Sequence, residues 1–153
     1  MNKHFKLCFR VIFLTSAWLM LAPAVPAADK TRSADVIPTE KGPLKIYPIN
    51  HATVVLQWSD KTIYVDPVGG SKPFQDLPRP DLILITDIHG DHLSKETLAQ
   101  LAGPQTKLVG PQSVVDQLPS DLRDRAATLA NGQTREFLGI QVEAVAAYNL
   151  TVE

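Results

Sequence analysis

Short apolar runs alternate with polar turns along the first half of the chain, and this pattern predicts strands. Thr53–Trp58 and Thr62–Val65 are rich in β-branched residues on either side of a polar turn, which predicts a β-hairpin. Leu44–Ile49 alternates too, but Pro48 interrupts it, so we expect an edge strand there. The continuous apolar run Leu82–Ile85 predicts a strand buried on both faces.

Helical spacing begins after this run. Ser94 offers an N-cap, and Gly103 with Pro104 ends the predicted helix. The pattern then predicts a helix over 95–101, a strand over 106–109, helices over 111–118 and 119–125, and a hairpin of 134–137 with 140–146. Strands followed by alternating strands and helices, then strands again, predict an α/β sandwich.

The first 27 residues have the composition of a leader. Three basic residues precede the apolar run Val11–Ala22, and Val25-Pro26-Ala27 resembles a signal-peptidase site. We expect 1–27 to be a signal peptide, 28–43 a polar N-terminal tail, and the protein periplasmic or secreted. A membrane anchor is the alternative, but a span needs about 20 apolar residues.

Removing residues 1–27 leaves 12 basic and 16 acidic residues, a net charge of −4. No basic stripe remains for nucleic acid, and we expect no membrane contact once the leader is removed. The only cysteine, Cys8, lies in the leader. Any bound metal must therefore be held by histidine and carboxylate side chains.

Four such side chains follow the buried strand 82–85 within six positions: Asp87, His89, Asp91 and His92. Residues two apart share a face in extended chain, and Gly90 permits a tight turn between them. The carboxyl end of a strand is also where α/β sheets place ligands. The cluster predicts a metal site. We expect the metal to be zinc, with manganese or iron as alternatives. The alternative is a helix-capping loop that happens to be rich in histidine.

The run Asp87-Ile88-His89-Gly90-Asp91-His92 resembles the His-x-His-x-Asp-His signature of the metallo-β-lactamase superfamily. Three further segments resemble the branch of the superfamily that contains ascorbate-phosphate lactonases and N-acyl-phosphatidylethanolamine phospholipase D. They are Asn50-His51-Ala52-Thr53, residues 62–67 and Ala147-Tyr148-Asn149. The resemblance implies the N-terminal half of an αββα sandwich over 44–153, a partial and truncated domain.

The resemblance also implies roles for the cluster. His89 would bind a first metal and Asp91 with His92 a second, while Asp91, the implied catalytic residue, would orient the attacking water. Asp87 stands where the family has a histidine, so it is either an oxygen ligand or the partner of a ligating histidine ring. His51 either fixes its turn or lines the site, and Asp66 either caps the turn before Pro67 or supports the metal-bearing loop.

The function implied is an exported metal-dependent hydrolase that directs a metal-activated water at an ester, lactone, amide or phosphodiester of an unidentified small molecule. The family completes its site with later histidines and an acid, but no histidine follows His92. We therefore expect a truncated chain that binds metal weakly and hydrolyses little. The alternative is a non-catalytic secreted binding or structural module on the same fold.

Overall fold

A computed structural model describes residues 32–147 of the chain, so the expected leader 1–27 and the motif residues Tyr148 and Asn149 lie outside it. One sheet contains seven strands, paired in chain order: β1 (Asp35–Ile37), β2 (Leu44–Asn50), β3 (Thr53–Trp58), β4 (Lys61–Val65), β5 (Leu82–Leu84), β6 (Lys107–Gly110) and β7 (Ala126–Thr128). A separate hairpin pairs β8 (Thr134–Phe137) with β9 (Ile140–Glu143). The helices are the 3-10 turn η1 (Lys72–Phe74), α1 (Lys95–Leu101), α2 (Gln112–Val115) and α3 (Ser120–Arg123).

The sheet changes from antiparallel to parallel at β4. β1 to β4 pair antiparallel, and β4 to β7 pair parallel. The predicted hairpin of β3 with β4 is confirmed. Its two loop residues, Ser59 and Asp60, have φ of 49° and 62°, and positive φ at both central positions matches the twist of the flanking strands.

Several boundaries differ from the sequence prediction. The expected tail 28–43 contains the strand β1, and β7 was not predicted at all. β1 pairs with β2 over Leu44–Ile46, so the prediction of an edge strand is wrong there, whereas Pro48 lies beyond the last β1 partner. The helices predicted over 111–118 and 119–125 are shorter, and the last strand ends at Glu143.

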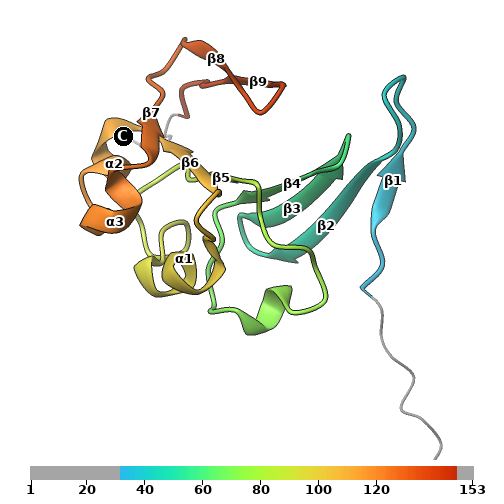
Figure 1. Cartoon of the computed structure of the whole chain (residues 1–153), viewed down its shortest axis with the longest axis horizontal. Coiled ribbons are helices and arrows are strands. Elements are labelled where there is room, and N and C mark those ends of the chain that lie inside the picture. Colours follow the sequence, from blue (N-terminus) through green and yellow to red (C-terminus); the bar gives the residue numbers. More distant parts are fainter. Residues whose placement is uncertain (1–31, 148–153) are drawn as a thin grey trace, which may run out of the picture. The chain divides into compact units, whose positions relative to one another are not determined.

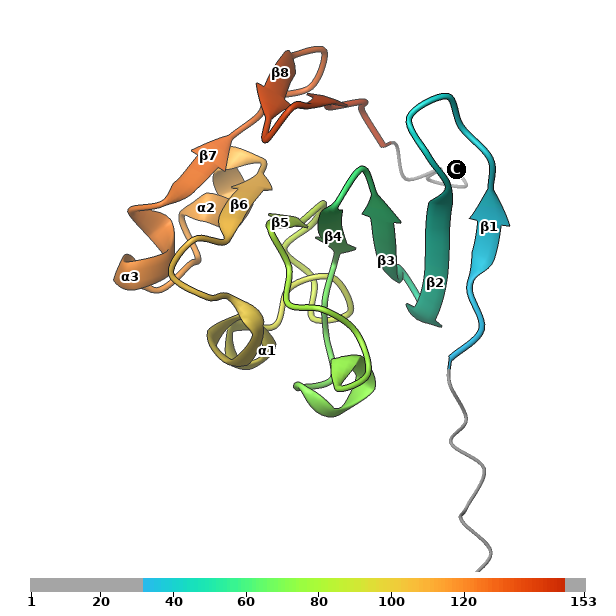
Figure 2. The same cartoon turned by 45° about the vertical axis from the view of Figure 1, so that its right-hand side comes forward.

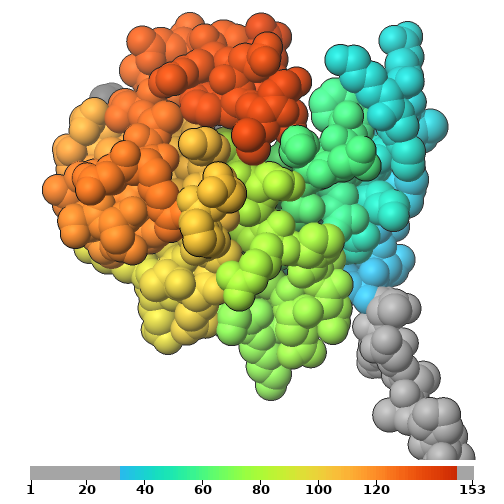
Figure 3. Space-filling view, in the orientation of Figure 1, coloured from blue at the N-terminus to red at the C-terminus, as the bar shows by residue number. Residues whose placement is uncertain are grey.

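Alternation along the strands of the large sheet divides the core between its two faces. On one face, Ile83 of β5 and Leu108 of β6 pack with buried leucines of α1 and α3, including Leu98 and Leu122. On the other face, Leu82 and Val109 pack with Phe137 of the β8–β9 hairpin. Figures 1 and 2 show the helices on one side of the sheet and the hairpin on the other. The atoms of the hairpin lie against the sheet in Figure 3. The described residues therefore form helix, sheet and hairpin layers.

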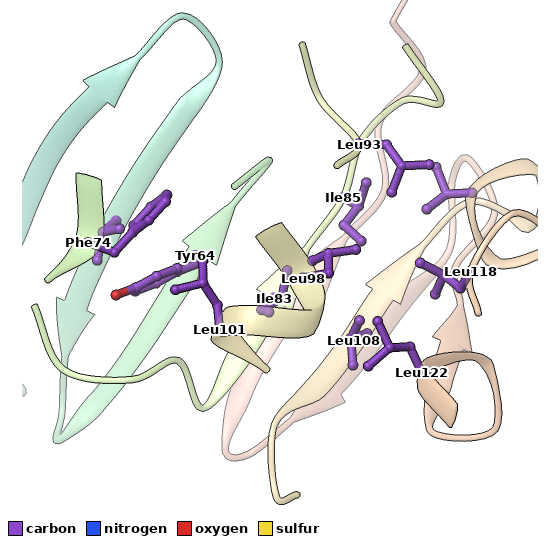
Figure 4. Packing of buried hydrophobic residues seen from close by; sticks show 12 residues of the cluster. Tyr64, Phe74, Ile83, Ile85, Leu93, Leu98, Leu101, Leu108, Leu118 and Leu122 are labelled. Atoms are coloured by element: carbon purple, nitrogen blue, oxygen red, sulfur yellow. The ribbon is translucent and has the colours of Figure 1, made fainter. Parts of the chain in front are cut away.

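The helical face buries most of the large side chains (Figure 4). Tyr64 stacks on Phe74 with ring centroids 5.0 Å apart, and its hydroxyl donates a 2.9 Å hydrogen bond to the Pro78 carbonyl. Burial raises the pKa of Tyr64 to about 12. Among the described residues, no helix is long and apolar enough to cross a membrane.

Candidate metal-binding loop

The candidate site begins at the carboxyl ends of the neighbouring parallel strands β4 and β5. Asp66 follows β4 directly, and its backbone N–H extends the ladder by bonding to the Leu84 carbonyl at 2.9 Å. Thr86 lies two residues after β5. Because parallel strands end at the same edge of a sheet, residues 20 positions apart in sequence, Asp66 and Thr86, come into contact there.

The buried carboxylate of Asp66 organises this edge. The residue is only 2 % exposed and has a left-handed φ of 44°. Its Oδ1 accepts from the Thr86 backbone N–H at 2.7 Å, and its Oδ2 accepts from the Thr86 hydroxyl at 2.6 Å. The same Oδ2 lies 2.9 Å from Nδ1 of His92. Thr53 also donates to the Asp66 carbonyl at 2.6 Å. Asp66 therefore joins the start and the end of the loop 86–92. Of its two expected roles, a cap of the turn before Pro67 or support of the loop, these contacts correspond to support of the loop.

The loop itself folds into one turn. Backbone N–H groups of His92 and Leu93 both donate to the His89 carbonyl, at 2.9 and 2.8 Å. Asp87 turns back on its neighbours: its Oδ1 accepts from the Ile88 N–H at 2.6 Å and its Oδ2 lies 2.8 Å from Nδ1 of His89. The hydrogen bond from His89 lowers the pKa of the Asp87 carboxyl, and the bond from Ile88 adds to this.

The helix α1 anchors the far end of the loop. Ser94 caps it, accepting from the Thr97 N–H at 3.2 Å, as predicted. The Thr97 hydroxyl in turn accepts from the Gly70 N–H at 2.9 Å. Gly69 and Gly70 have φ of 88° and 76°, which glycine adopts without strain. The segment after Asp66 is thus tied to the helix that follows the loop.

The four predicted ligands form two pairs. Asp87 lies with His89, and Asp91 lies with His92, whose Nε2 is 3.7 Å from an Asp91 oxygen. Across residues 32–147, no three His, Cys, Asp or Glu side chains gather closely enough to hold one metal ion. The donor chemistry nevertheless fits a divalent metal, because each ring offers Nδ1 to a carboxylate and keeps Nε2 for a ligand, the usual arrangement of a ligating histidine.

The contacts of two residues at this edge were hard to predict from the sequence. The sequence predicts a turn or loop role for Asp66, but its bond to His92 spans 26 positions and has no periodic signature. Thr86 directly precedes the motif 87–92, and no sequence pattern indicates that it donates twice to Asp66. His51 is exposed in the turn between β2 and β3 with φ of 47°, which agrees with its turn role.

His92 gives the metal-free chain a defined pH dependence. The hydrogen bond with Asp66 raises the pKa of His92, and nearby carboxylates add to this. A raised pKa in the folded state stabilises the fold fully below the unfolded value of about 6.5, and this stabilisation is lost as pH rises through the folded value. The free energy of unfolding, measured with urea in the presence of chelator, should therefore decline from about pH 5.5 to about pH 8.5. The His92→Gln variant should lack this decline. Equal slopes in both chains would contradict the assignment.

Comparison with known proteins places this geometry in a family. A profile of the beta-lactamase superfamily domain matches residues 45–153, and the chain belongs to this superfamily. A solved structure from Parabacteroides distasonis, assigned as a metal-dependent hydrolase, is similar with a TM-score of 0.67 and 29 % identity over 78 % of this chain. CmlA, a diiron β-hydroxylase from Streptomyces venezuelae, is similar with a TM-score of 0.53 and 25 % identity over 72 % of this chain.

The two relatives are longer than the matched region. The chain spans 53 % of the Parabacteroides protein and 25 % of CmlA. The α/β fold predicted from the sequence and the resemblance to the superfamily are confirmed. The shared feature of both relatives is a metal-dependent activity, and CmlA carries two irons.

Proposed function

We propose that this chain supplies the metal-binding loop of an exported hydrolase that acts on an ester, lactone, amide or phosphodiester. The observation that carries the proposal is the hydrogen bond between Asp66 and Nδ1 of His92, at 2.9 Å. It fixes the orientation of the ring and leaves Nε2 beside Asp91, as a ligating histidine requires. Membership of the superfamily and the likeness to a metal-dependent hydrolase support it.

Each loop residue has a role in the proposal. His89 would hold a first metal, and Asp91 with His92 would hold a second. Such a metal, when bound, supplies a water acidic enough to ionise near neutral pH. Asp87 holds Nδ1 of His89, so we favour it as the partner of a ligating ring over a direct ligand. Asp91 is 59 % exposed on its side chain, so its carboxylate is free to orient a water toward substrate.

The metal is proposed to be zinc, with manganese or iron as alternatives, because histidine and carboxylate suit all three. The two pairs of the loop are too few to hold an ion tightly. We propose that further ligands come from a region corresponding to the rest of the longer hydrolase, of which this chain spans 53 %. The 153-residue chain should then bind zinc weakly and turn over substrate slowly.

Calorimetric zinc titration of the 153-residue chain, with assays on one substrate of each proposed type, tests this function. We expect a dissociation constant for zinc of about 10 µM or larger. The His92→Ala variant should bind zinc about tenfold more weakly, or weaker still. Asp76→Asn, a change of an exposed carboxylate in the loop before β5, is the matched control and should bind like the parent. Zinc binding that His92→Ala leaves unchanged would contradict the proposal.

A non-catalytic secreted module is the second candidate. It is favoured by one observation, that residues 32–147 gather no three-ligand metal cluster. The same titration separates the two. A chain that binds none of zinc, manganese and iron, and that retains a cooperative unfolding transition, would support the module.

Export is proposed from the sequence of residues 1–27 alone. Cleavage after Ala27 would leave a chain beginning at Ala28, which the mass of the protein recovered from a periplasmic or culture fraction checks. A recovered mass that includes residues 1–27 would contradict it.

A further inference from the structure

A hollow of about 720 Å³ lies at the opposite end of β4 from the metal-binding loop. Lys61 begins the strand and borders the hollow, while Asp66 follows the last residue of the strand. At roughly 3.3 Å per residue, about 16 Å of strand separates the two. A molecule in this hollow therefore does not touch the candidate metal ligands. Its volume is within the range of about 300–1,000 Å³ typical of small-molecule sites.

The hollow lies at the end of the sheet where β3 turns into β4. Three of its lining residues, Lys45, Gln57 and Thr62, are cross-strand partners on β2, β3 and β4. Side chains two apart on a strand share a face, and Gln57 and Thr62 lie two positions from the core residues Val55 and Tyr64. Trp58 and Lys61 lie two positions from Leu56 and Ile63 of the other face, so the hollow extends around this end of the sheet. No residue of the β8–β9 hairpin borders it.

The lining is positively charged. Four cationic side chains from four segments border the hollow: Lys41, Lys45, Lys61 and Arg79. Only two carboxylates, Asp60 and Asp81, border it as well, and Asp81 already accepts the Thr62 N–H at 2.8 Å. Within the described part of the chain, the ion pairs within 4.0 Å all involve histidine, so none of these four cations is neutralised by one.

We propose that this hollow binds a soluble small molecule carrying two or more negative charges, of the phosphate or diphosphate class. A concave surface whose cationic side chains outnumber its carboxylates concentrates anions. Arg79 donates from Nη1 to the Leu101 carbonyl at 3.5 Å, and its other guanidinium N–H groups remain to bond phosphate oxygens. The lysines add point charges around it. The rim also carries Trp58, whose indole N–H donates to the Thr39 hydroxyl at 2.9 Å and which is therefore held in place.

Inorganic pyrophosphate is the probe. Titrated into the ¹⁵N-labelled chain at low salt, it should shift the amide signals of Lys45, Lys61 and Arg79 saturably, with a dissociation constant of about 1 mM or tighter. The affinity should fall as salt is added, because these side chains are solvated and screened. Lys45→Glu should weaken binding about tenfold or more, since it reverses one of the four charges.

The matched control is Lys72→Glu, which reverses an exposed lysine of η1 that does not border the hollow and should leave the affinity unchanged. Arg79→Gln is a second variant of the hollow. A circular dichroism melt of each variant distinguishes lost binding from lost fold. Shifts spread over lysines outside the hollow, or equal affinity in the Lys45→Glu and parent chains, would overturn the proposal. Binding to phosphatidylglycerol vesicles without saturable pyrophosphate binding would overturn it in favour of a membrane headgroup.

Discussion

Replacing Asp66 with alanine will lower the free energy of unfolding by about 3 kcal/mol, because it removes the buried acceptor of three hydrogen bonds. The side chain is 2 % exposed and accepts from the backbone and the hydroxyl of Thr86 and from Nδ1 of His92. The Thr86 and His92 donors are exposed or half-buried and can bond to water instead, so each lost bond costs about 1 kcal/mol, the usual net value. Urea unfolding in the presence of chelator measures the change.

Asp81→Ala is the matched control for this substitution. Asp81 precedes β5 and is half-buried, but its carboxylate accepts one hydrogen bond, from the Thr62 N–H. Its loss should cost about 1 kcal/mol, the usual net value of a single hydrogen bond. Asp66→Asn isolates the charge, since it keeps an oxygen for the Thr86 N–H but cannot accept at both positions. Equal losses for Asp66→Ala and Asp81→Ala would show that Asp66 does not organise the loop.

Replacing Leu98 with alanine will destabilise the fold by about 3 kcal/mol, within the range of about 2–5 kcal/mol for a buried leucine. Leu98 is 1 % exposed and fixes α1 onto β5 and β6 through the shared cluster with Ile83 and Leu108. Because α1 is capped by Ser94, two residues after His92, loosening the helix will also loosen the loop. Denaturant unfolding gives the first effect, and the zinc affinity gives the second.

Leu138→Ala provides the comparison for the core substitution. Leu138 is 40 % exposed, in the turn of the β8–β9 hairpin, and shares no core cluster with Leu98. Its truncation should change the free energy of unfolding by no more than about 0.5 kcal/mol. A loss at Leu138 as large as that at Leu98 would mean that the hairpin turn, and not α1, carries the packing.

Local pattern was enough for the elements that local chemistry determines. The β3–β4 hairpin, the buried strand β5 and the Ser94 cap follow from β-branched residues, an apolar run and a capping hydroxyl within a few positions. β7 was missed because two of its three residues are alanine, which has little strand preference. It is a strand because it pairs in parallel with β6, a contact that only the folded chain supplies.

The candidate site was likewise predictable only where residues close in sequence define it. The motif at 87–92 identified its residues, since they follow one another in sequence. Their pairing was not visible, because the partner of His92 is Asp66, 26 positions earlier. The sequence predicts Asp87 as a ligand or as the partner of a ligating ring, and the 2.8 Å contact of its Oδ2 with Nδ1 of His89 is the geometry of such a partner. Whether all four residues bind a metal stays a prediction.

The network at the carboxyl edge of β4 and β5 has an evolutionary consequence. One Oδ2 atom of Asp66 serves both the Thr86 hydroxyl and the His92 ring, so these three positions cannot drift independently. Loss of the hydroxyl at 86 changes how the carboxylate holds the ring, and a longer acid at 66 displaces it. In related sequences, substitutions at 66, 86 and 92 should therefore occur together.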